Sequence, residues 1–266
     1  ELTPTGVDAS LNFFDAKGLK GVDLGAQLFL EDEGYRVHLS PLNPIIAYRR
    51  FKLNDNNYIF LHNNMHVEAD FDLQADDGTG FKLYSTPNDE GRQDITLSVH
   101  DLNLDELTAV LPYMPKVGGT LSGDFHLVQQ EQSTSVLVDA GVQKLTYEGA
   151  PLDNMVINAL YLPNADGTHH VDGIILHNGS EVGTLSGTYN PAGQGTIEAQ
   201  ATLERLPLSL ANGFIPDNTV ELDGYATGEI YVRGRVSNPL LNGSLVTDSM
   251  YLNSDMYSLH LRFPND

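Results

Sequence analysis

Histidine pairs are the side chains in this sequence that come nearest to a metal site. His62 and His66 stand four residues apart, and His169 and His170 are adjacent. Imidazole nitrogens four residues apart can share a Zn²⁺ ion when they lie on a helix. The surrounding sequence is typical of strands and hairpins, however, and no third ligand is indicated. We therefore predict solvated loop histidines and no bound metal.

Two acidic segments, Asp76–Gly78 and Asp166–Gly167, resemble the beginning of a calcium-binding loop. Such a loop needs oxygen ligands at alternate positions and a closing Glu at about the twelfth position. Neither segment has them, whereas Asp-Gly dipeptides are typical of tight turns. We expect hairpin turns at both places.

No constellation of residues predicts catalysis. The segment Gly183–Gly187 approximates the Gly-x-Ser-x-Gly turn that exposes a nucleophilic serine, but its pattern is that of a strand. No glycine loop for phosphate ends in Lys-Ser or Lys-Thr, and no carboxylate pair stands out for acid-base work. The absence of Cys excludes disulfides, thiolate catalysis and cysteine-ligated zinc. The sequence thus predicts a protein that is not an enzyme and carries no cofactor.

Charge and hydropathy narrow the classes of partner. The 266 residues include 14 Lys and Arg against 36 Asp and Glu, a formal net charge of −22. Such an acidic chain disfavours nucleic acid and a polybasic patch for lipid headgroups. There is no run of about eighteen apolar residues, and Glu1–Ser10 lacks the pattern of a signal peptide. We expect the chain to be a fragment of a longer protein that carries any anchor.

Alternating apolar and polar residues dominate the chain. From Ala69 to Ala75 every second residue is apolar, and the residues between are Asp or Gln. This period of two predicts half-buried β-strands. Dipeptides such as Asn178–Gly179 and Asn242–Gly243 separate the runs and predict antiparallel hairpins. Short helices are expected at only three segments, Ser10–Phe14, Leu102–Leu111 and Leu206–Phe214.

Self-similarity divides the chain into units of about a hundred residues. The segment Gly123–Leu127 matches Gly228–Val232, 105 positions later, and each match follows one of the last two helical segments. Stacked repeats bury a shared surface between neighbours. We predict one continuous repeat body with units at 1–100, 101–204 and 205–266, the last of them truncated. Cut strand edges in such an array favour self-association.

Three longer phrases resemble a known protein family. Gly118–Phe125 and Ala226–Gly243 resemble the strand, Asn-Pro turn and strand of TamB proteins, and Val142–Leu152 resembles a further phrase of that family. TamB is the inner-membrane-anchored subunit of the translocation and assembly module, in the AsmA-like superfamily. The resemblance spans nearly the whole chain. The sequence departs from the family in lacking its transmembrane anchor and a recognisable segment for meeting its outer-membrane partner.

The resemblance implies both a fold and a function. The expected fold is all-β, an elongated open antiparallel sheet curled into a U-shaped apolar groove of the β-taco kind, with a few short helices. The expected function is a non-enzymatic scaffold of outer-membrane biogenesis that conducts phospholipid between the inner and outer membranes. The resemblance also implies a periplasmic location in a Gram-negative bacterium, and a parent protein that meets an outer-membrane β-barrel protein.

On this hypothesis the apolar strand faces contact phospholipid acyl chains. The residues expected to line the groove are Leu28, Leu30, Ala69, Phe71, Leu73, Leu121, Phe125, Leu127, Val136, Val138, Ile230 and Val232. The same alternation also predicts the closed core of a β-sandwich. The alternative function is therefore a secreted or surface β-sandwich module that binds glycan or protein.

Overall fold

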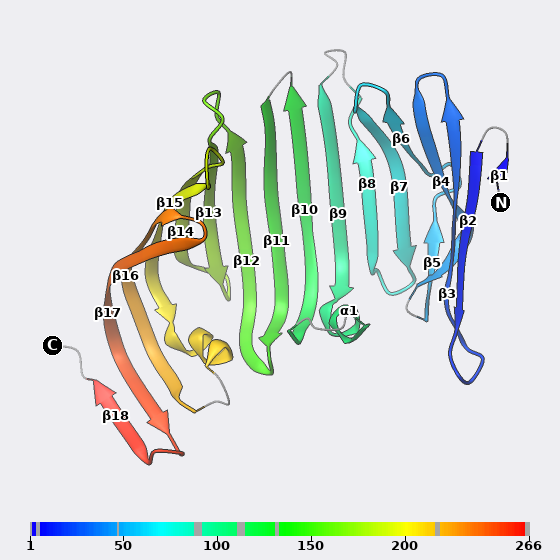
Figure 1. Cartoon of the computed structure of the whole chain (residues 1–266). Coiled ribbons are helices and arrows are strands. Elements are labelled where there is room, and N and C mark those ends of the chain that lie inside the picture. The colour runs from blue at the N-terminus through cyan, green and yellow to red at the C-terminus, as the bar shows by residue number, and fades with distance from the viewer. Residues whose placement is uncertain are drawn as a thin grey trace. The chain divides into compact units, whose positions relative to one another are not determined.

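The fold is all-β, as the alternating sequence predicts. A computed structural model of the chain describes residues 2–3, 6–46, 48–87, 92–110, 115–130, 133–215 and 219–263. Strands make up 75% of it and helices 5%, and the strands form a large antiparallel sheet (Figure 1). The predicted fold class is thereby confirmed.

The chain runs from strand to strand with two short helical interruptions. The strands are β1 (Leu2–Thr3), β2 (Gly6–Phe14), β3 (Lys20–Glu31), β4 (Gly34–Ile46), β5 (Arg49–Leu53), β6 (Tyr58–His62), β7 (Val67–Ala75), β8 (Gly80–Ser85), β9 (Gln93–Asn103), β10 (Val117–Gln130), β11 (Ser133–Tyr147), β12 (Ala150–Pro163), β13 (His169–His177), β14 (Ser180–Asn190), β15 (Thr196–Pro207), β16 (Glu221–Arg235), β17 (Asn238–Ser254) and β18 (Leu259–Phe263). The α-helix α1 (Leu104–Val110) follows β9, and the 3₁₀-helix η1 (Leu208–Phe214) follows β15.

Two of the three expected helices are present. Helices α1 and η1 confirm the predictions at residues 102–111 and 206–214, although Leu111 lies outside the described residues. The prediction of a helix at Ser10–Phe14 is wrong, because this segment is the second half of β2. Leu11 and Phe13 alternate there with polar neighbours, so the period is two and the residues pair with β3.

The chain divides into two compact units. Unit 1 comprises Glu1–Leu102 and Ser122–Thr134, and unit 2 comprises Asn103–Leu121 and Ser135–Asp266. One division therefore falls next to the first predicted repeat boundary, and residues 205–266 belong to unit 2 with the residues before them. The three-unit scheme stays an interpretation of the sequence.

Repeated backbone geometry accompanies the repeated sequence. In unit 1 the Asp101 backbone N–H donates to the Ser122 hydroxyl at 3.0 Å, and in unit 2 the Arg205 N–H donates to the Thr227 hydroxyl at 3.1 Å. Asp101 and Arg205 also share a positive φ, 47° and 49°. Asp101 and Arg205 each lie just before a helix, and Ser122 and Thr227 lie after it, so the same irregular strand end is built twice at nearly the same spacing.

A glycine with positive φ recurs in the same way. Gly119 has φ +119° and Gly224, 105 positions later, has φ +101°. A Cβ atom would lie 3.0 Å from the Lys144 carbonyl oxygen in the first case and 2.6 Å from the Ser249 oxygen in the second. Only glycine relieves both the close approach and the backbone strain at these two positions.

The largest buried cluster lies in unit 1. Phe51, Leu53, Leu73 and Ala75 pack together where β5 pairs with β7. Nearby, the Asn57 side chain is buried, accepts the Leu39 N–H at 2.8 Å and donates to the Leu39 carbonyl at 3.2 Å, like an extra strand residue. Each large apolar side chain fully buried there contributes about 1.5–3 kcal/mol, so this corner is a true core.

Candidate functional site

Strand register places one set of side chains on a common face of unit 2. Directly opposite residues of antiparallel strands point to the same side of a sheet. We call this set the unit 2 apolar face: Val136, Val138, Ala140 and Val142 of β11, Met155, Ile157, Ala159, Tyr161 and Pro163 of β12, His169, Val171, Gly173, Ile175 and His177 of β13, Gly183, Leu185, Gly187 and Tyr189 of β14, Ile197, Ala199, Ala201 and Leu203 of β15, Gly228, Ile230, Val232 and Gly234 of β16, and Pro239, Leu241, Gly243 and Leu245 of β17.

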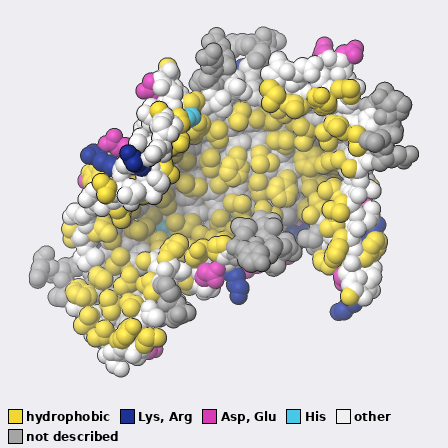
Figure 2. Space-filling model, in the orientation of Figure 1, with side chains coloured by type: hydrophobic (Ala, Val, Ile, Leu, Met, Phe, Trp, Pro, Cys, Tyr) yellow, Lys and Arg dark blue, Asp and Glu magenta, His cyan; other side chains and the backbone are white. Residues whose placement is uncertain are grey.

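None of the named positions of the unit 2 apolar face is Asp, Glu, Lys or Arg. Asp153 of β12 lies at the end of the face, where its carboxylate is 3.4 Å from His177. The opposite face carries charge, with Asp172, Glu198, Glu229 and Arg233 among its residues. Hydrophobic side chains crowd together over β11 and β12 in Figure 2. A chain with 36 acidic residues has therefore kept a broad surface free of them.

Four of the predicted lining residues share this face. Val136 and Val138 stand on β11, and Ile230 and Val232 stand on β16. All four are half-buried, so part of each side chain is open to a ligand. Leu121, also half-buried, lies on the part of β10 that belongs to unit 2. Contact of these residues with acyl chains stays a prediction.

Part of the face forms a hollow of about 500 Å³, which we call the tyrosine hollow. It is lined by Tyr161, His169, Val171, Leu185, Gly187, Thr188, Tyr189, Ile197 and Ala199. Gly187 creates part of its depth, because a Cβ atom there would lie only 2.9 Å from the Cβ of Ala199. The lining combines apolar residues with a wall of aromatic rings.

An aromatic stack forms this wall. The His169 ring lies between those of Tyr161 and Tyr189, with centroid distances of 5.7 and 5.9 Å and interplanar angles of 13° and 23°. The Tyr161 hydroxyl and His169 Nδ1 form a hydrogen bond of 2.6 Å. His170 points to the opposite face and binds Asp172 at 2.9 Å. The adjacent histidines therefore do not converge on one site.

Unit 1 also gathers its predicted lining residues on one side. Register connects Leu28 through Val37 and Ile59 to Ala69, and alternation adds Leu30, Phe71 and Leu73. Ala69 and Leu73, however, are only 3% and 5% exposed, whereas Leu30 is 62% exposed. Ala69 and Leu73 are therefore packed by the chain itself and offer almost no surface to a lipid.

Two further predicted residues are placed by their polar neighbours on β10. Asp124 and His126 form hydrogen bonds with Ser98 and Asp94 of β9. Phe125 and Leu127 alternate with them, so these two side chains point to the apolar side of unit 1. Both are half-buried.

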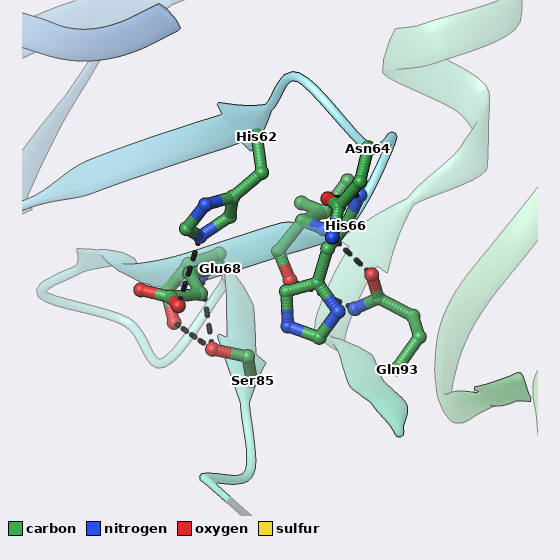
Figure 3. Close-up of polar contacts among 8 residues, drawn as sticks. His62, Asn64, His66, Glu68, Ser85 and Gln93 are labelled. Atoms are coloured by element: carbon green, nitrogen blue, oxygen red, sulfur yellow. Dashed lines mark hydrogen bonds and ion pairs between the residues drawn. The ribbon is translucent and has the colours of Figure 1, made fainter. Parts of the chain in front are cut away.

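A second hollow, the polar hollow of unit 1, has a volume of about 700 Å³. Tyr58, His62, Glu68, Lys82 and Tyr84 are among the residues that line it. His62 Nε2 lies 2.9 Å from the Glu68 carboxylate, and Figure 3 shows the two side chains pointing toward one another. His62 and His66 are both half-buried. The prediction of solvated loop histidines is wrong for His62, which lies on β6, and for His169 and His170, which lie on β13.

Side chains in this region complete the sheet. Gln93 accepts the Val67 N–H at 2.6 Å and donates to the Val67 carbonyl at 2.8 Å, and Ser85 bonds the N–H and carbonyl of Ala69 (Figure 3). β8 pairs with β7 only as far as Asp70, so these side chains replace missing ladder bonds. No three His, Asp or Glu side chains among the described residues are arranged to hold a metal ion.

The acidic segments that resembled calcium loops are turns. The Asp166 carboxylate accepts the Thr168 hydroxyl at 2.6 Å and the Thr168 N–H at 2.9 Å, and these hydrogen bonds lower the pKa of Asp166. At the equivalent turn the N–H of Thr79 bonds Asp77 and lowers its pKa. Each carboxylate therefore accepts hydrogen bonds from a residue of its own hairpin turn.

No protein family model matches the chain, and no curated protein or solved structure is significantly similar to it. Neither helix in the described part of the chain has the length and apolar character needed to cross a membrane. The family resemblance of the sequence stays a prediction.

Proposed function

We propose that this chain is a non-enzymatic, periplasmic part of the machinery of outer-membrane biogenesis, and that it carries phospholipid acyl chains on the unit 2 apolar face. The observation that carries the proposal is the absence of charged side chains from the named positions of that face on β11 to β17. The TamB-like phrases in β10, β11 and β16 support the same assignment. An outer-membrane β-barrel protein is the proposed partner of the parent protein.

The dimensions of the face suit an acyl chain. Neighbouring strands lie about 4.8 Å apart, so seven strands offer an apolar contour about 29 Å long. The hydrocarbon core of a bilayer is about 30 Å thick for two leaflets, so one acyl chain needs about half of the contour. Each CH₂ group removed from water contributes about 0.8 kcal/mol, without any preferred position along the face. Such non-directional contact permits a lipid to slide.

The alternative function, binding of glycan or protein, is supported by a different place. The polar hollow of unit 1 combines Tyr58 and Tyr84 with charged residues such as Lys82, and aromatic rings beside hydrogen-bonding groups are suited to sugar rings. This reading predicts a ligand in the polar hollow of unit 1. A glycan-binding measurement with Tyr84→Ala as the variant would support it.

A pair of neighbouring substitutions tests the lipid proposal. Leu185 lines the tyrosine hollow, whereas Thr184 is equally half-buried and points to the opposite face. We expect Leu185→Asp to lower extraction of a fluorescent phospholipid from vesicles by about tenfold or more, because a carboxylate among acyl chains loses hydration. The same substitution at the neighbour, Thr184→Asp, should leave extraction nearly unchanged.

Thermal unfolding of both variants controls for loss of the fold. Phospholipid that co-purifies with the wild-type chain, identified by mass spectrometry, provides a second measurement. Equal extraction by the two variants, with both folded, would remove the unit 2 apolar face as the lipid site.

A further inference from the structure

The unit 2 apolar face has one polar feature that its lipid-carrying role does not explain. β13 begins with His169 and ends with His177, and both imidazoles stand on the apolar face. His177 Nε2 lies 3.4 Å from the Asp153 carboxylate, and its side chain is only 10% exposed. His169 instead stands at the tyrosine hollow with no carboxylate against it among the described residues.

The hydrogen bond to Tyr161 orients the His169 ring. It occupies Nδ1, and no described residue forms a hydrogen bond with Nε2. When the phenol O–H donates to Nδ1, the imidazole proton is on Nε2, which makes Nε2 a donor, and the protonated ring is a donor there as well. The neighbouring Tyr189 is 39% exposed and its ring stacks on His169, while its hydroxyl lies beside Gly195 in the turn after β14.

We infer that the Tyr161, His169 and Tyr189 wall binds the phosphate of a phospholipid whose acyl chain lies over Val171, Gly187 and Ala199. This inference rests on the proposed lipid-carrying function and adds a fixed position for the headgroup. The face carries two imidazoles, and His177 is already paired with the Asp153 carboxylate. His169 bonds Tyr161 instead, so it can contact an anion without a carboxylate beside it. A phosphate offers several oxygen acceptors, of which one can accept from Nε2 of His169.

The volume of the tyrosine hollow is suited to one acyl chain at a time. A volume of about 500 Å³ is at the scale of a single small ligand. The aromatic rings present an apolar body toward the chain and a polar edge toward the headgroup, the arrangement that places Tyr and His at boundaries between apolar and wet surroundings. The wall therefore defines where a lipid stops on an otherwise uniform face.

Three probes that share one hydrocarbon chain length and differ in their polar group test this inference on the whole protein. Binding of hexadecyl phosphate, palmitate and hexadecanol is measured by calorimetry for the wild type, His169→Phe and His169→Gln. We expect the wild type to bind hexadecyl phosphate about tenfold to a hundredfold more tightly than hexadecanol, the range of a hydrogen bond to a charged group. Phe keeps the ring stack and should abolish this preference while hexadecanol binds as before. Gln keeps an N–H donor and should retain part of the preference.

Several results would overturn the inference. Equal weakening of all three probes by His169→Phe would show that the ring only packs the wall. A wild-type preference confined to palmitate would assign the site to a fatty carboxylate in place of a phosphate. Binding of hexadecanol and hexadecyl phosphate with equal affinity would leave the lipid-carrying face intact and remove the headgroup site, whereas no binding of any probe would remove both.

Discussion

At the scale of single residues, most polar side chains that suggested chemistry bond back to their own chain. Gln93 and Ser85 form hydrogen bonds with the backbone of β7 where a strand partner is missing. Asp166 accepts the Thr168 N–H in the turn after β12. Sequence spacing identified Asp166 but not its use, because an Asp-Gly-Thr segment can begin either a turn or a metal loop. No sequence pattern pointed to Gln93 or Ser85. The hydrogen bonds of the folded hairpin distinguish the two.

The Asp166 turn allows a titration test. The Thr168 hydroxyl is the first cause of the lowered pKa of Asp166, so Thr168→Val should raise that pKa toward the ordinary value of 3.8. A lowered carboxyl pKa contributes stability above the unfolded value, and the contribution disappears as pH falls through the folded value. NMR titration of the Asp166 carboxyl carbon measures the change, with Thr168→Ser as the variant that keeps the hydroxyl. An unchanged pKa in the Val variant would contradict the assignment.

At the scale of elements, β17 has a long edge without a strand partner among the described residues. Its residues pair with β18 only from Met250 to Ser254, so within the described residues Asn238–Val246 has a partner in β16 alone. This segment contains no charged residue, and its side chains are exposed on both faces. An uncharged strand edge with free ladder groups favours pairing with another strand.

We propose that this edge mediates the self-association expected from the sequence. Ser244→Glu places a charge in the middle of the edge and should weaken self-association by up to about fivefold, the range of like-charge cross-strand pairs. Ser180→Glu adds the same charge at an exposed position on β14 and should have little effect. Sedimentation velocity over a concentration series compares them. A wild-type chain that is monomeric at every concentration would contradict the proposal.

At the scale of the whole molecule, net charge opposes contact between copies. The formal charge is −22 at pH 7, and the sequence pI is about 4.5. Like-charged copies repel, while the apolar faces and the β17 edge attract. The oligomeric state therefore depends on conditions that weaken the repulsion.

We expect self-association to increase as pH falls from 7 toward 4.5, and to increase with salt at pH 7, because both changes weaken repulsion. The pKa values of Asp77, Asp166 and Asp172 are lowered below 3.8, so the hydrogen bonds of their hairpins persist through this range. Association should consequently precede acid unfolding. Light scattering and circular dichroism recorded on the same samples measure the two events, and unfolding that comes first would contradict this order.

The sequence alone determined the fold class, because a period of two in the side chains admits only strands with an apolar and a polar face. It also identified a sequence match 105 positions apart, which is the spacing of Ser122 and Thr227, the hydroxyls that accept the N–H groups of Asp101 and Arg205. Two of its predictions failed, the helix at Ser10–Phe14 and the solvated loop position of His62, His169 and His170. Short windows do not show which strand a segment will pair with.

Only the tertiary structure decided which apolar residues are core and which are surface. Leu73 and Val232 belong to the same sequence pattern, yet Leu73 is buried beside Leu53 and Val232 is half-open on the unit 2 apolar face. Burial depends on which other segment covers a strand, and alternation within one strand carries no information about that. The wall of Tyr161, His169 and Tyr189 likewise exists because register brings β12, β13 and β14 together. The spacing of these residues along the chain gives no sign of it.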